Sequence, residues 1–173
     1  MGVITTIDFT ILHFIKDHTR NKVLDKTMPI ISRLGDFGLI WICSALSLLA
    51  FPHYRRYVPF FFFSLIASFL IGEVVLKTLI GRTRPCNIES VSLLINQPQD
   101  FSFPSGHSMS SFAVSTFLWH INHDIGNVAI VMATLIALSR LYLFVHYPTD
   151  VIAGSILGRI VGYLFYHLTI MVY

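Results

Sequence analysis

Apolar stretches long enough to cross a lipid bilayer occupy most of this sequence, and short polar segments separate them. The hydrocarbon core of a bilayer is about 30 Å thick, and a helix of roughly 20 residues crosses it. A spanning segment has to satisfy its own backbone hydrogen bonds, so each stretch is predicted to be a helix. The predicted spans are Gly35–Phe51, Tyr57–Ile80, Ser105–Ile121, Gly126–Val145 and Val151–Val172. The sequence therefore predicts an all-α integral membrane protein, a bundle of about five transmembrane helices.

The composition agrees with a bilayer as the solvent. Of the 173 residues, 54% are hydrophobic and only 12% are charged, whereas about a quarter are charged in a soluble domain. The length suggests one domain, residues 1–173, in which residues 1–34 form a basic interfacial segment and residues 35–173 form the transmembrane bundle. The basic residues form no continuous stripe beside exposed aromatic residues, which argues against nucleic-acid binding.

The N-terminal segment is expected to lie on the membrane surface. Val3–Ile15 alternates apolar residues with threonines, an aspartate and a histidine. It is too short and too polar to span, so an amphipathic helix in the interface is predicted. Lys16–Asp36 follows with five basic residues. We interpret it as a surface segment that includes a second short helix and faces lipid headgroups.

Three short polar motifs interrupt the apolar pattern. The first is Lys77 followed after six residues by Arg84-Pro85, the second is Pro104-Ser105-Gly106-His107, and the third is Ser139-Arg140 followed after five residues by His146 and after three more by Asp150. With five spans, the loop 81–103 and the turn around His146 lie on the same side of the membrane. The three motifs are therefore expected to meet at one face.

The residue types in these motifs suit phosphate chemistry. Asp150 can accept a hydrogen bond from one imidazole nitrogen of His146 across a tight turn, which leaves the other nitrogen free as a nucleophile. The planar guanidinium of Arg140 suits two phosphate oxygens. Lys77 and Arg84, two helical turns apart, add positive charge that would stabilise a transferring phosphoryl group. Taken one at a time, each residue has an ordinary structural explanation.

The second motif precedes an apolar helix. Ser105 is expected to cap that helix, and Gly106 would let a ligand approach the backbone. The unpaired amides at the start of a helix favour an anion. Alone, this motif would indicate no more than a capped helix, with His107 near the interface.

Together the three motifs resemble the signature of the type 2 phosphatidic acid phosphatase (PAP2) family, which shares its site with vanadium haloperoxidases and acid phosphatases. The resemblance covers residues 77–150. It implies that His146 attacks phosphorus and forms a phosphohistidine, that Asp150 orients His146, and that His107 protonates the leaving group and later activates water. It also implies that the phosphoryl oxygens are held by Lys77, Arg84, Ser105, the Gly106 amide and Arg140.

The resemblance implies no metal and no other cofactor. Asp150 is the only acidic residue inside the motifs, so no Mg²⁺ cage is expected. The implied partners are a lipid phosphate and the bilayer itself. The implied reaction is dephosphorylation of a lipid phosphate or diphosphate, and undecaprenyl diphosphate and phosphatidylglycerophosphate are the favoured substrates because the chain is small.

Two other functions were weighed against this one. A non-catalytic protein that binds or transports lipid phosphates could use the same cationic pocket, but it would not need His146, Asp150 and His107. Haloperoxidase chemistry would require bound vanadate and normally a soluble chain, and five spans argue against it.

The sidedness of the motifs is the one point on which the observations disagree. With five spans, the basic segment before Gly35 lies on the face of the motifs, and the positive-inside rule would place that face in the cytoplasm. The resemblance implies an extracytoplasmic site in a multi-pass protein of the cell membrane. We follow the resemblance here, and the conflict disappears if Val3–Ile15 itself spans.

The last predicted span carries a glycine at every fourth position, at Gly154, Gly158 and Gly162. Such a face lets another helix approach closely. Packing inside the bundle is the default interpretation, and a homodimer is the alternative. Arg159 lies beside this face and could extend towards the membrane surface to meet a substrate or a lipid headgroup.

Overall fold

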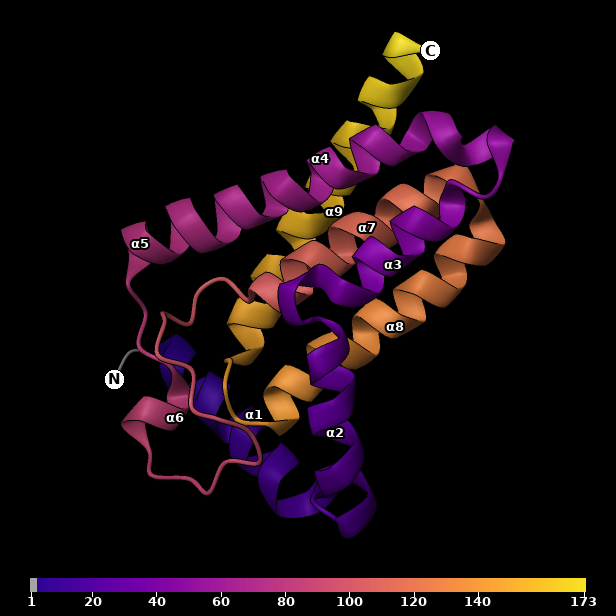
Figure 1. The fold of residues 1–173 in the computed structure, drawn as a ribbon. Helices are drawn as coiled ribbons and strands as arrows, with labels where there is room; N and C mark the ends of the chain where they lie inside the picture. Colours follow the sequence, from indigo (N-terminus) through magenta and orange to yellow (C-terminus); the bar gives the residue numbers. More distant parts are fainter. Residues whose placement is uncertain (1–2) are drawn as a thin grey trace.

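The computed structural model describes residues 3–173, and this part of the chain is built from helices, with no strand among those residues. Figure 1 shows their arrangement. The all-α prediction is confirmed. The α-helices are α1 (Val3–Thr19), α2 (Lys22–Leu34), α3 (Leu39–Leu48), α4 (Val58–Phe69), α5 (Lys77–Ile80), α6 (Pro85–Ile88), α7 (Gly106–Ile121), α8 (His123–Tyr142) and α9 (Pro148–Val172).

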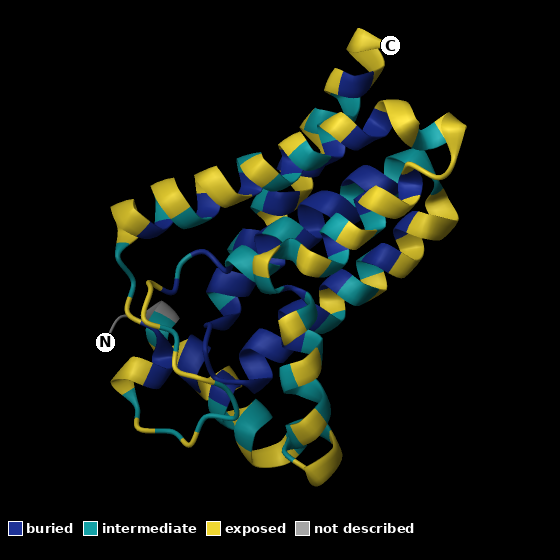
Figure 2. Cartoon of the chain, in the orientation of Figure 1, coloured by how far each residue is buried: buried dark blue, intermediate teal, exposed yellow. Residues whose placement is uncertain are grey.

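Helix α7 forms the centre of the bundle. It packs against α4, α8 and α9, and Figure 2 shows it in the colours of buried and intermediate residues, since none of its residues is exposed. The indole of Trp41 on α3 donates a 3.0 Å hydrogen bond to the Ser111 hydroxyl of α7. With 16 residues, α7 is shorter than a helix that crosses a bilayer unaided. Its surroundings are mostly other helices, so protein takes the place of lipid around it.

The glycine face of α9 packs against α7. A Cβ atom at Gly158 would lie 2.2 Å from the Met109 carbonyl oxygen, and one at Gly162 would lie 2.1 Å from that of Ala113. Only glycine permits backbones to approach so closely. The small-residue face is therefore occupied within the chain. The neighbouring Arg159 lies with its guanidinium 5.1 Å from the Phe112 ring.

The predicted spans correspond to helices, but their limits differ. Three segments of residues 3–173 are long and apolar enough to cross a membrane: Pro52–Ile88, α8 and α9. Helices α2 and α3 add a fourth if they form one span, bent by 52°. The predicted start of the helix Gly35–Phe51 is wrong. Phe37 and Gly38 adopt positive φ angles of 53° and 68°, which are not helical, so α3 begins only at Leu39. A count of five spans stays a prediction.

The N-terminal helix α1 packs against α8 and α9. It extends beyond the expected end at Ile15, and the side chains of Asp8 and Leu12 are buried on the face towards the bundle. The opposite face exposes Ile7, Ile11 and Phe14. After it, the Asn21 side chain caps α2, so the second short helix is confirmed.

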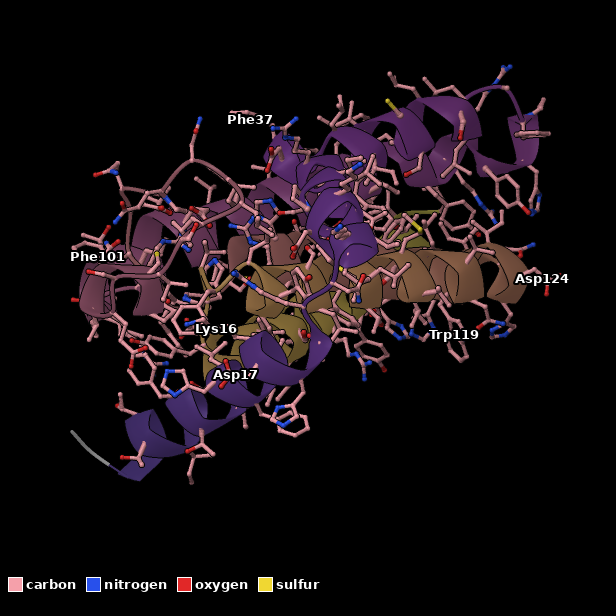
Figure 3. The ribbon with its side chains drawn as sticks, turned by 90° about the horizontal axis from the view of Figure 1, so that it is seen from below. Lys16, Asp17, Phe37, Phe101, Trp119 and Asp124 are labelled. Atoms are coloured by element: carbon pink, nitrogen blue, oxygen red, sulfur yellow. The ribbon has the colours of Figure 1, made fainter. Side chains whose placement is uncertain are left out.

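The long loop 81–103 covers one end of the bundle and contains the short helix α6 (Figure 1). Figure 3 shows Phe101 of this loop at one end of the molecule and Trp119 and Asp124, at the turn between α7 and α8, at the other. All three motifs lie at the end that the loop covers.

Candidate active site

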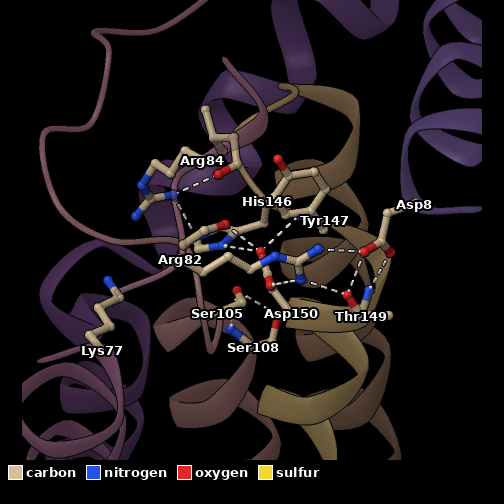
Figure 4. A network of polar contacts seen from close by, with 12 residues as sticks. Asp8, Lys77, Arg82, Arg84, Ser105, Ser108, His146, Tyr147, Thr149 and Asp150 are labelled. Atoms are coloured by element: carbon tan, nitrogen blue, oxygen red, sulfur yellow. Dashed lines mark hydrogen bonds and ion pairs between the residues drawn. The ribbon is translucent and has the colours of Figure 1, made fainter. Parts of the chain in front are cut away.

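Each motif places its polar side chains at the start or end of a helix, as Figure 4 shows for most of them. Lys77 begins α5 and Arg84 precedes α6. His107 lies in the first turn of α7, and Arg140 in the last turns of α8. His146 follows α8 in the connecting turn. A cavity of about 1090 Å³ is lined by Lys77, Arg84, Gly106, His107, Arg140 and His146, whereas Ser105 and Asp150 lie behind its wall.

His146 is buried, with 1% of its surface exposed. Its Nε2 lies 2.9 Å from Nη1 of Arg84. Arginine is only a donor, so Nε2 accepts this hydrogen bond and the proton of the neutral ring is on Nδ1. Burial and the charges of Arg84 and Arg140 hold the pKa of His146 well below its usual range. The ring is therefore neutral, and its Nε2 lone pair is directed at Arg84, which lines the same cavity.

Asp150 lies on the other side of the His146 ring. Its Oδ2 is 3.5 Å from Nδ1 of His146, which is too long for a good hydrogen bond, and Nδ1 has no other partner. The expected hydrogen bond is therefore a loose contact in this structure. The reason is that Oδ2 already accepts hydrogen bonds from the backbone N–H of Tyr147, at 2.9 Å, and from the Ser102 hydroxyl.

Three of the cationic side chains that line the cavity are buried, and their charges repel one another. Lys77, Arg84 and Arg140 each expose 5% or less of their surface. Arg140 donates to the Ser32 hydroxyl, while its Nε has no partner. Arg140 is thus a buried charge with an unpaired donor, which is costly without an anion. The cavity is therefore suited to binding an anionic group.

Asp100, which the sequence analysis did not single out, occupies part of this anion site. Its carboxylate bridges Nζ of Lys77 and Nη2 of Arg84, the latter at 2.9 Å. Burial alone would raise the pKa of the Asp100 carboxyl, but the hydrogen bond from Lys77 and the charge of Arg84 outweigh it and lower the pKa to about 2. Asp100 is therefore ionised and takes hydrogen bonds that a phosphoryl group would accept.

The second motif begins α7, and the predicted cap at Ser105 is confirmed. Ser105 caps α7, and its hydroxyl oxygen accepts hydrogen bonds from the N–H and, at 2.9 Å, the hydroxyl of Ser108. A Cβ atom at Gly106 would lie 1.9 Å from Oε1 of Glu73. A side chain at position 106 would therefore displace the Glu73 carboxylate, which comes from a π-helical segment, Leu70–Leu76. Such segments are frequent at functional sites.

His107 also lines the cavity. Its Nε2 lies 2.8 Å from Oδ1 of Asp36, in the short 3₁₀ turn between α2 and α3. The carboxylate fixes the orientation of the ring. Asp36 is a second residue that the sequence analysis missed.

The same cavity has an apolar side wall. Ile42 of α3 and four residues of α4 line it: Phe62, Leu65, Ile66 and Phe69. Of these, Ile66 and Phe69 are also exposed on the outside of the bundle. A cationic end and an apolar wall in one cavity suit a ligand with an anionic head and an apolar chain.

Helices of membrane-spanning length and a buried cationic cavity with a neutral histidine define this chain, by fold and site, as a multi-pass membrane phosphatase. Phosphoryl transfer needs chiefly positive charge around the phosphoryl oxygens and a positioned nucleophile, and both are present. The chain belongs to the PAP2 superfamily, whose family model matches residues 57–172.

Several relatives are named as phosphatases. The chain is 30% identical over 159 residues to the undecaprenyl-diphosphatase BcrC of Bacillus subtilis, covering 91% of this chain and 80% of the relative. It is 32% identical over 150 residues to the undecaprenyl-diphosphatase of Sulfolobus acidocaldarius, covering 86% and 72%. The crystal structure of the transmembrane PAP2 type phosphatidylglycerolphosphate phosphatase from Bacillus subtilis matches with a TM-score of 0.84 at 24% identity, covering 100% of this chain and 89% of that one.

Proposed function

We propose that this protein removes a phosphate group from a membrane lipid phosphate or diphosphate without a metal, and that undecaprenyl diphosphate or phosphatidylglycerophosphate is the substrate. The observation that carries the proposal is the single cavity in which His146 and three buried cations meet an apolar wall. An isoprenoid or acyl chain can remain against α3 and α4 while the phosphate enters the cationic end. Undecaprenyl diphosphate ranks first because two relatives that share most of their length with this chain carry that name.

In the proposed reaction, Nε2 of His146 attacks phosphorus and the bond from phosphorus to the leaving oxygen breaks. His107 gives its proton to that oxygen. Water then attacks the phosphohistidine, its proton passes to His107, and inorganic phosphate leaves. Asp150 keeps the His146 ring in place and stabilises its positive charge in the intermediate.

The phosphoryl oxygens are held in this proposal by Lys77, Arg84 and Arg140, together with the amide of Gly106. Ser105 contributes by capping α7, so that the free amides of the first turn point at the anion. On binding, the phosphoryl group displaces Asp100 from Lys77 and Arg84.

The proposed membrane arrangement has five spans and an extracytoplasmic active site, and α1 lies in the interface. The exposed apolar face of α1 supports this position, because it can enter the headgroup region while the other face packs against the bundle.

The function is tested by phosphate release from purified protein in detergent with EDTA present. We expect release from one of three lipids (undecaprenyl diphosphate, phosphatidylglycerophosphate or phosphatidic acid) by the native chain and none by His146→Ala. Release by both proteins would contradict the histidine mechanism. Binding of the lipids without release by either protein would favour the non-catalytic binding function.

Sidedness is tested by cysteine labelling in intact cells. Cys86 is buried and is a poor reporter, but Gln99 in the loop over the site is exposed. With Cys43 replaced by serine, Gln99→Cys should react with a membrane-impermeant maleimide, and His123→Cys, at the opposite end, should react only after permeabilisation. The reverse pattern would place the site in the cytoplasm.

Asp100 competes with phosphate, so Asp100→Asn should tighten inhibition by inorganic phosphate. We expect an inhibition constant lower by up to about tenfold, because the half-exposed carboxylate is partly screened by solvent. Glu89→Gln is the matched control, since Glu89 lies in the same loop but contacts His13. Weaker inhibition by phosphate in Asp100→Asn would show that Asp100 supports the anion site.

A further inference from the structure

Behind Asp150, away from the cavity, lies a second group of charged side chains (Figure 4). Arg82 donates from Nη1 to Oδ1 of Asp150 at 2.7 Å and from Nη2 to Oδ2 of Asp8 at 2.7 Å. Its guanidinium also lies 3.8 Å from the centre of the Tyr147 ring. Arg82 thus joins two carboxylates and is held flat against an aromatic face.

Asp8 comes from α1, far from the motifs in sequence and outside the residues that the family model matches. Only 1% of its surface is exposed. It accepts hydrogen bonds from the backbone N–H of Thr149 at 3.1 Å and from the Thr149 hydroxyl at 2.7 Å, in addition to the bond from Arg82. A buried carboxylate with so many donors has one defined position.

Neither Arg82 nor Asp8 lines the cavity, so neither reaches the substrate. Both instead affect Asp150, the residue that contacts His146. Arg82 takes Oδ1 of Asp150, which leaves Oδ2 for Tyr147, Ser102 and the face of His146. Asp8 in turn holds Thr149, the residue next to Asp150.

We propose that Asp8 and Arg82 form a positioning pair for Asp150, so that helix α1 completes the active site. The pair fixes the orientation of the Asp150 carboxylate and shares its negative charge with Arg82. The role rests on the proposed function, in which Asp150 supports His146. It assigns a catalytic consequence to helix α1.

The charges predict opposite effects for the two residues. The groups that face His146 are Arg84, Arg140, Lys77 and His107 on the cationic side, and Asp150 on the other. Without Arg82, the negative charge of Asp150 is less compensated, and protonated His146 is favoured. Without the charge of Asp8, Arg82 compensates Asp150 more strongly, and protonated His146 is disfavoured.

The test measures kcat and KM over a range of pH for Asp8→Asn and Arg82→Met on the lipid that the native chain hydrolyses. We expect kcat to fall by roughly 10- to 100-fold in both variants, as for other residues that orient a catalytic group, with KM changed less than about twofold. The acid limb of kcat/KM should move to lower pH in Asp8→Asn and to higher pH in Arg82→Met. Arg82→Lys, which keeps the charge but loses the second donor to Asp8, should restore the acid limb and only part of kcat.

Asp17→Asn is the matched control, because Asp17 lies exposed on the same helix (Figure 3). All rates refer to the monodisperse fraction after size-exclusion chromatography, so loss of folded protein is counted separately. Losses of kcat without opposite movements of the acid limb would overturn the positioning role and leave a structural one. If the native chain has activity that depends on His146 and both variants match it, only this proposal fails; if the native chain has no such activity, the proposed function fails first.

Discussion

His146→Gln is expected to release phosphate at least about 1,000-fold more slowly than the native chain, because in the proposed reaction Nε2 of His146 supplies the lone pair that attacks phosphorus. Glutamine has a similar size, and its carbonyl oxygen can still accept the hydrogen bond from Arg84 that Nε2 of His146 accepts at 2.9 Å. The cationic groups of the cavity are untouched, so the variant should still bind the lipid. A loss confined to kcat therefore identifies His146 as the nucleophile.

The intermediate gives an independent measurement. Brief incubation with substrate labelled in the transferred phosphate, followed by an alkaline quench, should leave label on the native chain, and acid should release it, as expected for a phosphohistidine. His146→Gln should carry no label. His123→Gln is the control, since His123 lies at the opposite end of the bundle, beside Trp119, and it should behave as the native chain. Label retained on His146→Gln would place the nucleophile elsewhere.

The sequence predicted the part of the site that has a fixed spacing. Lys77, Arg84, His107, Arg140 and His146 lie at the ends of helices, and the apolar runs between them dictate which ends meet. The three motifs together therefore predicted which residues line the cavity. They also predicted that His146 and Asp150 are neighbours, but the expected hydrogen bond between them is a looser contact of 3.5 Å. The distance depends on the Tyr147 N–H and the Ser102 hydroxyl, which donate to Asp150. The spacing of the motifs does not predict these donors.

The carboxylates that partner these cations could not be predicted in the same way. Asp8 and Asp36 come from the N-terminal segment, which packs against the motifs only in the folded bundle. Each is separated from its partner, Arg82 or His107, by more than 70 residues. For Asp100 the sequence offered only its position, a few residues before the second motif in a long loop. The bend at Phe37 was also unforeseen, since a left-handed phenylalanine is uncommon.

The partners follow one physical rule. A buried cation is costly unless an anion is near, and here the chain supplies most of these anions. Lys77 has Glu73 and Asp100, Arg84 shares Asp100, and His107 has Asp36. Among the buried cations of the cavity in the described residues, Arg140 forms no ion pair. Substrate binding would therefore exchange one anion for another at Lys77 and Arg84 and bring an anion to Arg140.

His107→Gln is expected to slow phosphate release from the lipid by about 100- to 10,000-fold, the usual contribution of a general acid. The leaving oxygen of a lipid phosphate is a poor leaving group without a proton, which His107, oriented by Asp36 at 2.8 Å, supplies in the proposed reaction. With p-nitrophenyl phosphate the leaving phenolate needs no proton, so the first step should lose little. The second step still needs His107 to activate water, so phosphohistidine should accumulate.

Stopped-flow measurement of nitrophenolate should therefore show, for His107→Gln, a rapid burst of about one equivalent per site followed by slow turnover. The native chain should show no such burst if hydrolysis of the intermediate is fast. Asp36→Asn should shift the lipid reaction in the same direction but less, because the imidazole remains and only its orientation and charge are less well fixed. An equal loss on both substrates, with no burst, would mean that His107 binds the phosphoryl group and that the proton comes from another donor.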